Sequence, residues 1–191
     1  MSKLETNTID NISGSSTLTI GDSNTSTIAL KSGATLTNFP TNTPAFRAYK
    51  SGNTTLSDAT QTAIVYDSEF FDTDSAYDTS TGIFTVPSGK GGKYFLNTAT
   101  RLTGGTANAF ESAFVQLEIN GTNNEYRQRS YSTSGGNFNN DSIELNGVID
   151  LSAGDAVKVT VLLNVASGTA VLVGASGANA VTTFGAYKII E

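Results

Sequence analysis

The chain has 191 residues, of which 38% are hydrophobic and 15% are charged, and its net charge is −6. Its 11 basic residues are scattered along the sequence, which argues against nucleic-acid binding because neutralising phosphates needs clustered Lys and Arg. The sequence has no His and no Cys, which excludes histidine-based triads, thiol nucleophiles, disulfides and typical zinc sites.

Residues 1–43 differ from the rest and predict a β-rich arm or stalk. Short Thr-rich segments with one or two aliphatic residues alternate with turn residues in a degenerate repeat of about eight to ten residues. The few aliphatic residues of this segment cannot form a hydrophobic core by themselves. The arm must therefore pack on copies of itself, on the head or on a partner. A disordered polar tail is the alternative, but disorder normally lacks regular β-branched aliphatics. The candidate anchoring or trimerisation residues are Ile9, Ile12, Leu18, Ile20, Ile28, Leu30 and Leu36.

Residues 39–44 form a predicted linker, because two prolines there interrupt strand pairing and stiffen the chain. We therefore divide the chain into an arm, residues 1–43, and a head, residues 44–191. The first residues are polar and lack the apolar core of a signal peptide. No run approaches the roughly 20 apolar residues of a membrane helix. We expect synthesis in the cytoplasm without a signal peptide, and no membrane insertion.

The head is predicted to consist of short strands joined by polar turns. Apolar and polar residues alternate clearly over 114–119 and 157–161, and Asn120-Gly121 is the strongest hairpin signal of the chain. No stretch has helical periodicity. About ten such strands predict an all-β sandwich or jelly roll. They cover residues 46–50, 63–66, 82–86, 93–101, 114–119, 125–131, 142–151, 156–164, 169–173 and 183–190.

The stretch over residues 66–96 organises the head, because its aromatic residues recur at wide intervals between Asp, Ser, Thr and Gly. Residues 82–86 form a strand that ends at Pro87, since proline cannot donate to a ladder. A Gly-rich turn follows over residues 88–92. This pattern predicts a hairpin between strands 82–86 and 93–101, whose aromatic side chains pack on a second sheet.

Several residues of this stretch share the spacing of a known family pattern, namely Tyr66, Asp72, Tyr77, Phe84 and Gly92-Lys93-Tyr94. In this order they resemble the signature of the C1q-like globular heads, part of the wider tumour-necrosis-factor-like jelly rolls. The sequence departs from the pattern where Tyr66 replaces Phe, in a longer turn before Gly92, and where Leu96 replaces Phe. Three further segments resemble other strands of the family in the same order, namely residues 44–48, 154–157 and 183–187.

The resemblance spans roughly residues 44–191 and implies a jelly-roll head that forms a homotrimer. A β-rich repeat before such a head is similar to modular structural proteins of bacterial viruses. We therefore expect a non-enzymatic structural protein of a bacteriophage virion surface, either a fibre or a capsid decoration protein. The arm would bind other virion proteins of the capsid or tail, and the head would face outward.

A receptor- or glycan-binding tip, that is an adhesin, is the first alternative. Tyr and Arg are typical interface anchors, and loops rich in Gly, Asn and Ser supply adaptable hydrogen bonds to a host glycan or protein. A solvent-exposed strand with a polar loop explains the same stretch, and both interpretations stay open. The candidate surface-binding residues are Tyr126, Arg127, Arg129, Tyr131 and Asn137.

A glycan depolymerase that uses two carboxylates is the second alternative, with candidates Asp67, Glu69, Asp72, Asp74 and Asp78. Carboxylates are common in polar turns, so we predict no catalytic residue. No cofactor or metal site is predicted either. Asp72-Thr73-Asp74 offers oxygen ligands to calcium but lacks the Gly and Glu of an EF-hand loop, so calcium stays open with no residue assigned.

Overall fold

The computed structural model describes residues 32, 42–105, 110–130 and 138–189, with the backbone alone at Tyr126. The chain divides into two units, Met1–Phe39 and Pro40–Glu191, and all described residues except Ser32 belong to the second. Apart from Ser32, Asn42 and Thr43, the predicted arm lies outside the described residues, as do all seven of its aliphatic candidates, so their roles stay predictions.

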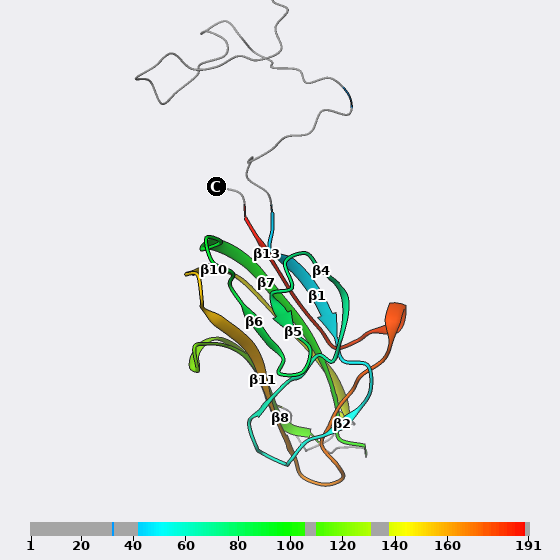
Figure 1. Ribbon diagram of the computed structural model, residues 1–191. Coiled ribbons are helices and arrows are strands. Elements are labelled where there is room, and N and C mark those ends of the chain that lie inside the picture. Colours follow the sequence, from blue (N-terminus) through cyan, green and yellow to red (C-terminus); the bar gives the residue numbers. More distant parts are fainter. Residues whose placement is uncertain (1–31, 33–41, 106–109, 131–137, 190–191) are drawn as a thin grey trace, which may run out of the picture. The chain divides into compact units, whose positions relative to one another are not determined.

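The described part of the head is a sandwich of two antiparallel sheets (Figure 1), which confirms the predicted jelly-roll sandwich. A 3-10 turn at Gly177–Asn179 is its only helical element, and no helix in it could cross a membrane. Sheet A has the order β2 (Thr54–Thr55), β12 (Val171–Leu172), β7 (Gly92–Thr103), β13 (Thr183–Lys188), β1 (Ala45–Tyr49) and β4 (Ser68–Asp72), and β10 (Asn140–Leu151) pairs with the other side of β7. Sheet B has the order β5 (Tyr77–Asp78), β6 (Ile83–Thr85), β11 (Ala156–Val165), β8 (Phe110–Ile119) and β9 (Thr122–Ser130), and β3 (Thr62–Ala63) pairs with β11.

An aromatic cluster fills the space between the two sheets at the end where β1 and β6 meet. The Phe46 ring stacks on Tyr77 and Phe84, with centroids 4.8 and 4.9 Å away, and meets the edge of Phe184 at 5.1 Å. Such pairs contribute about 0.5–1.5 kcal/mol each beyond their burial. Because the family-like aromatic positions lie in this cluster, that stretch of sequence builds the core.

Hydroxyl and carboxylate groups of the same stretch satisfy one another and the backbone. The Tyr66 hydroxyl lies 2.8 Å from Thr98 Oγ1, and Tyr77 donates to the Tyr66 carbonyl at 3.1 Å. Burial raises the pKa of both tyrosine hydroxyls well above their ordinary value. Asp72 accepts hydrogen bonds from the backbone N–H groups of Asp74 and Tyr77, at 3.1 and 2.8 Å. Asp72 therefore closes the β4–β5 loop, as Asx turns do.

The predicted hairpin between residues 82–86 and 93–101 is wrong. Strand β6 pairs with β5 and β11 in sheet B, whereas β7 pairs with β10, β12 and β13 in sheet A. The Gly-rich turn therefore crosses from one sheet to the other. Val86 N–H donates to Asp155 O at 2.9 Å and Gly154 N–H donates to Val86 O at 2.8 Å, which ties the end of β6 to the β10–β11 turn.

Other local predictions have mixed outcomes. The Asn120-Gly121 hairpin is confirmed, because it joins β8 to β9 and both residues have positive φ, 52° and 76°. The strand predicted over 63–66 is limited to β3, and β4 was not predicted at all. Strand β4 lacks a clear alternation because two adjacent phenylalanines occupy its centre.

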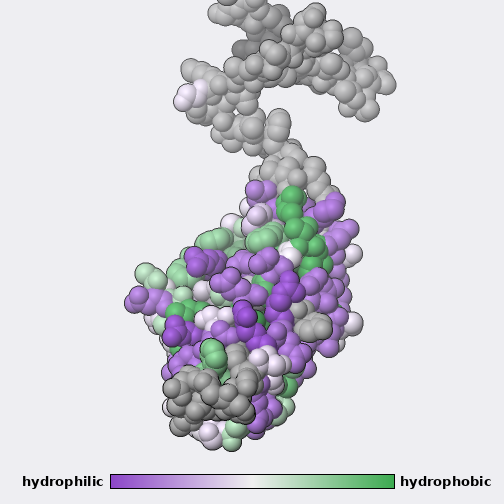
Figure 2. All heavy atoms as spheres, turned by 180° about the vertical axis from the view of Figure 1, so that it is seen from behind, coloured by the Kyte–Doolittle hydropathy of each residue, from purple (hydrophilic) through white to green (hydrophobic). Residues whose placement is uncertain are grey.

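The head begins and ends at the same end of the sandwich (Figure 1). β1 and β13 are antiparallel neighbours, with Ala45 opposite Tyr187, and Lys188 N–H donates to Pro44 O at 3.0 Å. The residue after β13, Ile189, donates to Lys93 O at 2.8 Å. Seen from behind, the head is mainly hydrophilic, and its hydrophobic surface gathers toward this upper end (Figure 2).

Candidate functional site

The outer face of sheet A carries an unusual share of exposed hydrophobic side chains. Of the five large hydrophobic residues exposed in the described part of the chain, four lie on this face: Phe70 (40% exposed), Phe71 (50%), Val148 (57%) and Tyr187 (43%). Contiguous exposed apolar surface on a soluble domain marks a binding or assembly surface.

Strand alternation and register create one half of this surface. In β7, Tyr94 and Leu96 are buried in the core, so Phe95 between them points outward. The register places Val148 of β10 and Tyr187 of β13 on either side of Phe95. The rings of Phe95 and Tyr187 lie 5.4 Å apart. A row of apolar side chains therefore crosses three adjacent strands.

The other half surrounds Arg47 on β1. The pairing of β1 with β4 has an irregularity between Arg47 and Ala48, which brings both Phe70 and Phe71 to the outer side. The Arg47 guanidinium lies 4.6 Å from the centroid of the Phe70 ring, a cation–π contact. Tyr49 packs on the same ring at 4.7 Å. We call the combined surface the aromatic face and define it as Arg47, Tyr49, Phe70, Phe71, Phe95, Val148 and Tyr187.

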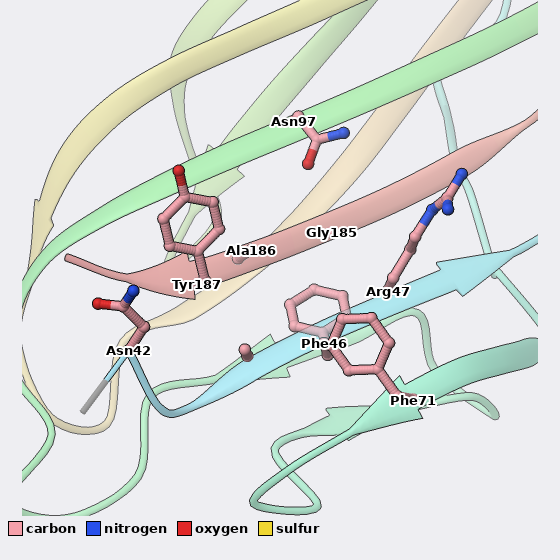
Figure 3. Close-up of a pocket in the computed structure, with 9 residues that line it drawn as sticks. Asn42, Phe46, Arg47, Phe71, Asn97, Gly185, Ala186 and Tyr187 are labelled. Carbon is pink, nitrogen blue, oxygen red and sulfur yellow. The ribbon is translucent and has the colours of Figure 1, made fainter.

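A hollow of about 450 Å³ lies within the aromatic face, above Gly185 of β13 (Figure 3). A Cβ atom at Gly185 would lie 3.0 Å from Phe46 O and 3.3 Å from Asn97 Oδ1, so the floor is open because this residue has no side chain. Tyr187, Asn97 and Arg47 project around the floor from three neighbouring strands (Figure 3). Aromatic, amide and guanidinium groups in one hollow suit the reception of a protruding side chain or a polar ligand.

The predicted surface-binding residues are only partly described. Tyr131 and Asn137 lie outside the described residues, and at Tyr126 the backbone alone is placed, within β9. The β8–β9 register sets Arg129 opposite the buried Ala113, so its side chain starts from the core-facing side of this edge strand. Arg129 Nε lies 3.2 Å from Asp141 Oδ2 on β10. Arg129 therefore links the edges of the two sheets.

Arg127 lies two residues before Arg129 on β9, opposite Val115 of β8, and its side chain is exposed. It starts from the same side of β9 as Arg129. None of the described candidates on β9 lies on the aromatic face, so the sequence pointed to a different surface. Their proposed binding to a ligand stays a prediction.

The candidate carboxylates serve local turns. Asp67 accepts hydrogen bonds from Lys50 Nζ and from Ser51 N–H, the latter at 2.8 Å. Partial burial works to raise the pKa of the Asp67 carboxyl, but these hydrogen bonds outweigh it and hold the pKa below its ordinary value. Burial, together with the charge of Asp72, raises the pKa of Glu69.

Asp74 and Asp78 do line a common hollow of about 530 Å³ beside β5 and β6. Asp74 accepts a hydrogen bond from Thr73 Oγ1 at 2.6 Å, and Asp78 accepts from Ser80 Oγ and Ser80 N–H at 2.7 and 2.8 Å. Hydrogen bonds from Ser80 lower the pKa of Asp78, whereas a general acid needs a raised pKa. In the part of the chain that the structure describes, no three His, Cys, Asp or Glu side chains could hold a metal ion together.

Comparison with known proteins shows the fold. No family model and no curated protein matches the sequence. The globular domain of zebrafish complement 1qA matches 78% of this chain and 98% of its own length, with 14% identity and a TM-score of 0.55. Murine APRIL covers 76% of this chain and 98% of its own length, with 14% identity and a TM-score of 0.53. Eiger TNF from S. frugiperda covers 77% and 92%, with 12% identity and a TM-score of 0.51. The head therefore has the C1q- and TNF-like jelly-roll fold that its sequence resembles.

Proposed function

We propose that this chain is a non-enzymatic structural protein of a bacteriophage virion surface, a homotrimeric fibre or capsid decoration protein. Its arm attaches to other virion proteins and its head faces outward. The observation that carries the assembly part of this proposal is the aromatic face, which gathers four exposed large hydrophobic side chains on one sheet. Covering such a face with copies of the same head removes it from water, which stabilises the assembly.

The place where the arm joins the head supports a trimer with parallel heads. Asn42, two residues before the head, lines the hollow of the aromatic face together with Tyr187 near the end of β13. A trimer in which each copy turns this face toward the threefold axis therefore places the three Asn42 residues around that axis. The three copies of residues 1–41 would then start close to the same axis, as a shared stalk or anchor requires.

The assembly is tested by measuring the mass of the full-length protein in solution by light scattering. We expect three times the chain mass of 19.9 kDa. The variant Val148→Asp should shift the mass toward the monomer, because a charge would replace an apolar side chain that is 57% exposed on this face. Glu111→Asp, a conservative change at an exposed position of β8, serves as the control. A wild-type protein that stays monomeric at high concentration contradicts the proposal.

The virion role needs a separate test, because assembly alone does not locate the protein. Particles that lack the protein are incubated with the full-length chain and with a chain lacking residues 1–43. We expect only the full-length chain to sediment with the particles. Attachment that is unchanged by the deletion would show that the arm is not the anchor.

A receptor- or glycan-binding tip is the second candidate, and the hollow above Gly185 favours it. Tyr187 and Phe71 offer aromatic surfaces, and Arg47 and Asn97 offer hydrogen-bond donors around one depression. This site would be free only if the aromatic face stayed open. Saturable binding of the monomeric head to host cells would favour this function over the structural one.

A further inference from the structure

The outer side of sheet A carries charges of opposite sign toward its two edges. Arg47 lies on β1 toward the β4 edge, while Glu144 and Asp150 lie on β10 at the opposite edge. Glu144 lies between the buried residues Ile143 and Leu145, so it points to the outer side of sheet A. The outer side of sheet A therefore carries Arg47 toward one edge and the carboxylates of Glu144 and Asp150 at the other, where Lys93 of β7 lies opposite Asp150.

These opposite charges do not meet within one copy. Strands β7 and β13 separate β10 from β1, which places Arg47 and Glu144 about 14 Å apart across the sheet at the usual strand spacing. Among the described residues the Arg47 guanidinium contacts the Phe70 ring and makes no ion pair, and Glu144 makes no ion pair either. Arg101 lies close to Glu144 along β7, opposite Ser142, and makes no ion pair with it.

Symmetry limits how copies can use this surface. A closed trimer is built from heterologous contacts, in which one patch of each copy meets a different patch of the next. The outer side of sheet A already holds two different patches, with Phe70, Phe71 and Arg47 toward one edge and Val148 and Glu144 at the other. Both patches combine exposed apolar surface with an unpaired charge, and the charges have opposite sign.

We infer that the trimer closes head to tail, with the Arg47 side of one copy's aromatic face packed against β10 of the next copy, and with Arg47 and Glu144 forming the ion pair across each interface. This inference rests on the proposed trimer and names the surfaces that form it. Val148 of the second copy then adds apolar contact next to Phe71 of the first. Complementary charges at such a contact fix which patch meets which and penalise the reversed arrangement.

The test is charge reversal in the full-length protein. Arg47→Glu and Glu144→Arg each place like charges across every interface, and we expect each to raise the concentration at which trimers dissociate by at least about tenfold. The double variant restores opposite charges with their positions exchanged and should return most of the affinity. Glu111→Arg reverses a charge on β8, outside sheet A, and should leave the mass unchanged. Sedimentation velocity over a concentration series measures the wild-type protein and all four variants.

The outcomes separate the inference from the proposed function. If wild-type protein is a trimer but both single variants keep its affinity, the ion pair is absent and the inference is wrong. If the single variants dissociate and the double variant does not recover, the face forms the interface but these residues do not pair. A monomeric wild-type protein instead overturns the trimer itself. Both side chains are exposed, so circular dichroism should show folded protein for every variant.

Discussion

At the scale of single residues, the aromatic residues that resemble a family signature act as packing groups. Tyr66, where the family pattern has Phe, is fully buried, and its hydroxyl lies against Thr98. Thr98 also donates to Thr183 O at 2.9 Å, so the added hydroxyl extends an existing hydrogen-bond chain from the core to β13. The tyrosines are therefore tolerated because each buried hydroxyl has a partner.

The buried tyrosines predict a loss of stability at alkaline pH. Burial raises the pKa of Tyr66 and Tyr77 far above the ordinary value and raises that of Tyr94 to about 12. Their contribution is complete below the unfolded-state pKa of about 10 and is lost as pH rises from there toward the folded-state values. We expect the melting temperature to fall steeply above about pH 10. Tyr66→Phe should cost about 1 kcal/mol at neutral pH.

The same variant provides the control for this alkaline loss. Without the Tyr66 hydroxyl, one of the groups that must release a proton on unfolding is gone, so the curve of melting temperature against pH should be shallower than in wild type. Thermal unfolding followed by circular dichroism measures both curves. Parallel curves would show that Tyr66 does not contribute to the alkaline transition.

Gly82 provides a second residue-scale prediction, because two separate effects act there. Its φ is 76°, and an added Cβ would lie 2.4 Å from Ile64 O. Gly121 has the same φ of 76° and nothing within 4 Å of an added Cβ. Gly121→Ala should therefore cost about 1 kcal/mol for the backbone conformation alone, and Gly82→Ala should cost at least about 2 kcal/mol more because backbone must move. Urea unfolding measures the two costs, and equal costs would contradict the steric argument.

At the scale of elements, the sequence predicted most strands but not all of their partners or faces. The alternation of apolar and polar residues predicted β8 and β11, whose apolar residues lie in the core, although Gln116, Glu118 and Thr160 on their other side are buried as well. Alternation also places Phe70 and Phe71 on opposite faces, whereas the irregular pairing of β4 with β1 brings both outward. The aromatic face was missed for this reason, and because Phe95, Val148 and Tyr187 become neighbours only through the register of distant strands.

The attachment of the segment before β3 to sheet B gives an element-scale prediction. Gln61 Nε2 donates to Glu118 Oε1 at 2.8 Å and to Thr160 Oγ1 at 2.9 Å, and Lys158 Nζ lies 3.0 Å from Glu118 Oε2. Glu118 is only 7% exposed. Glu118→Ala would leave Lys158 and Gln61 without this partner, and we expect a loss of about 1–3 kcal/mol.

Glu111 is the matched control for this variant because it lies on the same strand, β8, and is exposed. It accepts one hydrogen bond from Asn164 at 2.8 Å. Glu111→Ala should change the free energy of unfolding by less than about 0.5 kcal/mol, as is usual for surface positions. The shift of the urea midpoint measures both variants. A Glu118 variant as stable as the Glu111 variant would mean that the buried contacts of Glu118 add nothing to the stability of the fold.

At the scale of the whole molecule, the head has what an independent folding unit needs. In the part of the chain that the structure describes, every residue of the buried hydrophobic core lies between Phe46 and Ala186, inside the unit Pro40–Glu191. With no cysteine in the sequence, no disulfide adds to this core or to an assembly of copies. The assembled state therefore depends on non-covalent burial of surface and on protein concentration.

Deleting residues 1–43 tests whether the head both folds and assembles without the arm. Because the core formed by the described residues lies wholly in the remaining chain, we expect a cooperative unfolding transition. Its melting temperature should rise with protein concentration, because association of folded copies stabilises them by mass action. Because the aromatic face lies entirely in the head, the mass should still correspond to three copies. A trimer that needs residues 1–43 would make the arm, and not the face, the element that holds the copies together. A folded monomer with and without the arm would leave the aromatic face to be covered by a different protein of the particle.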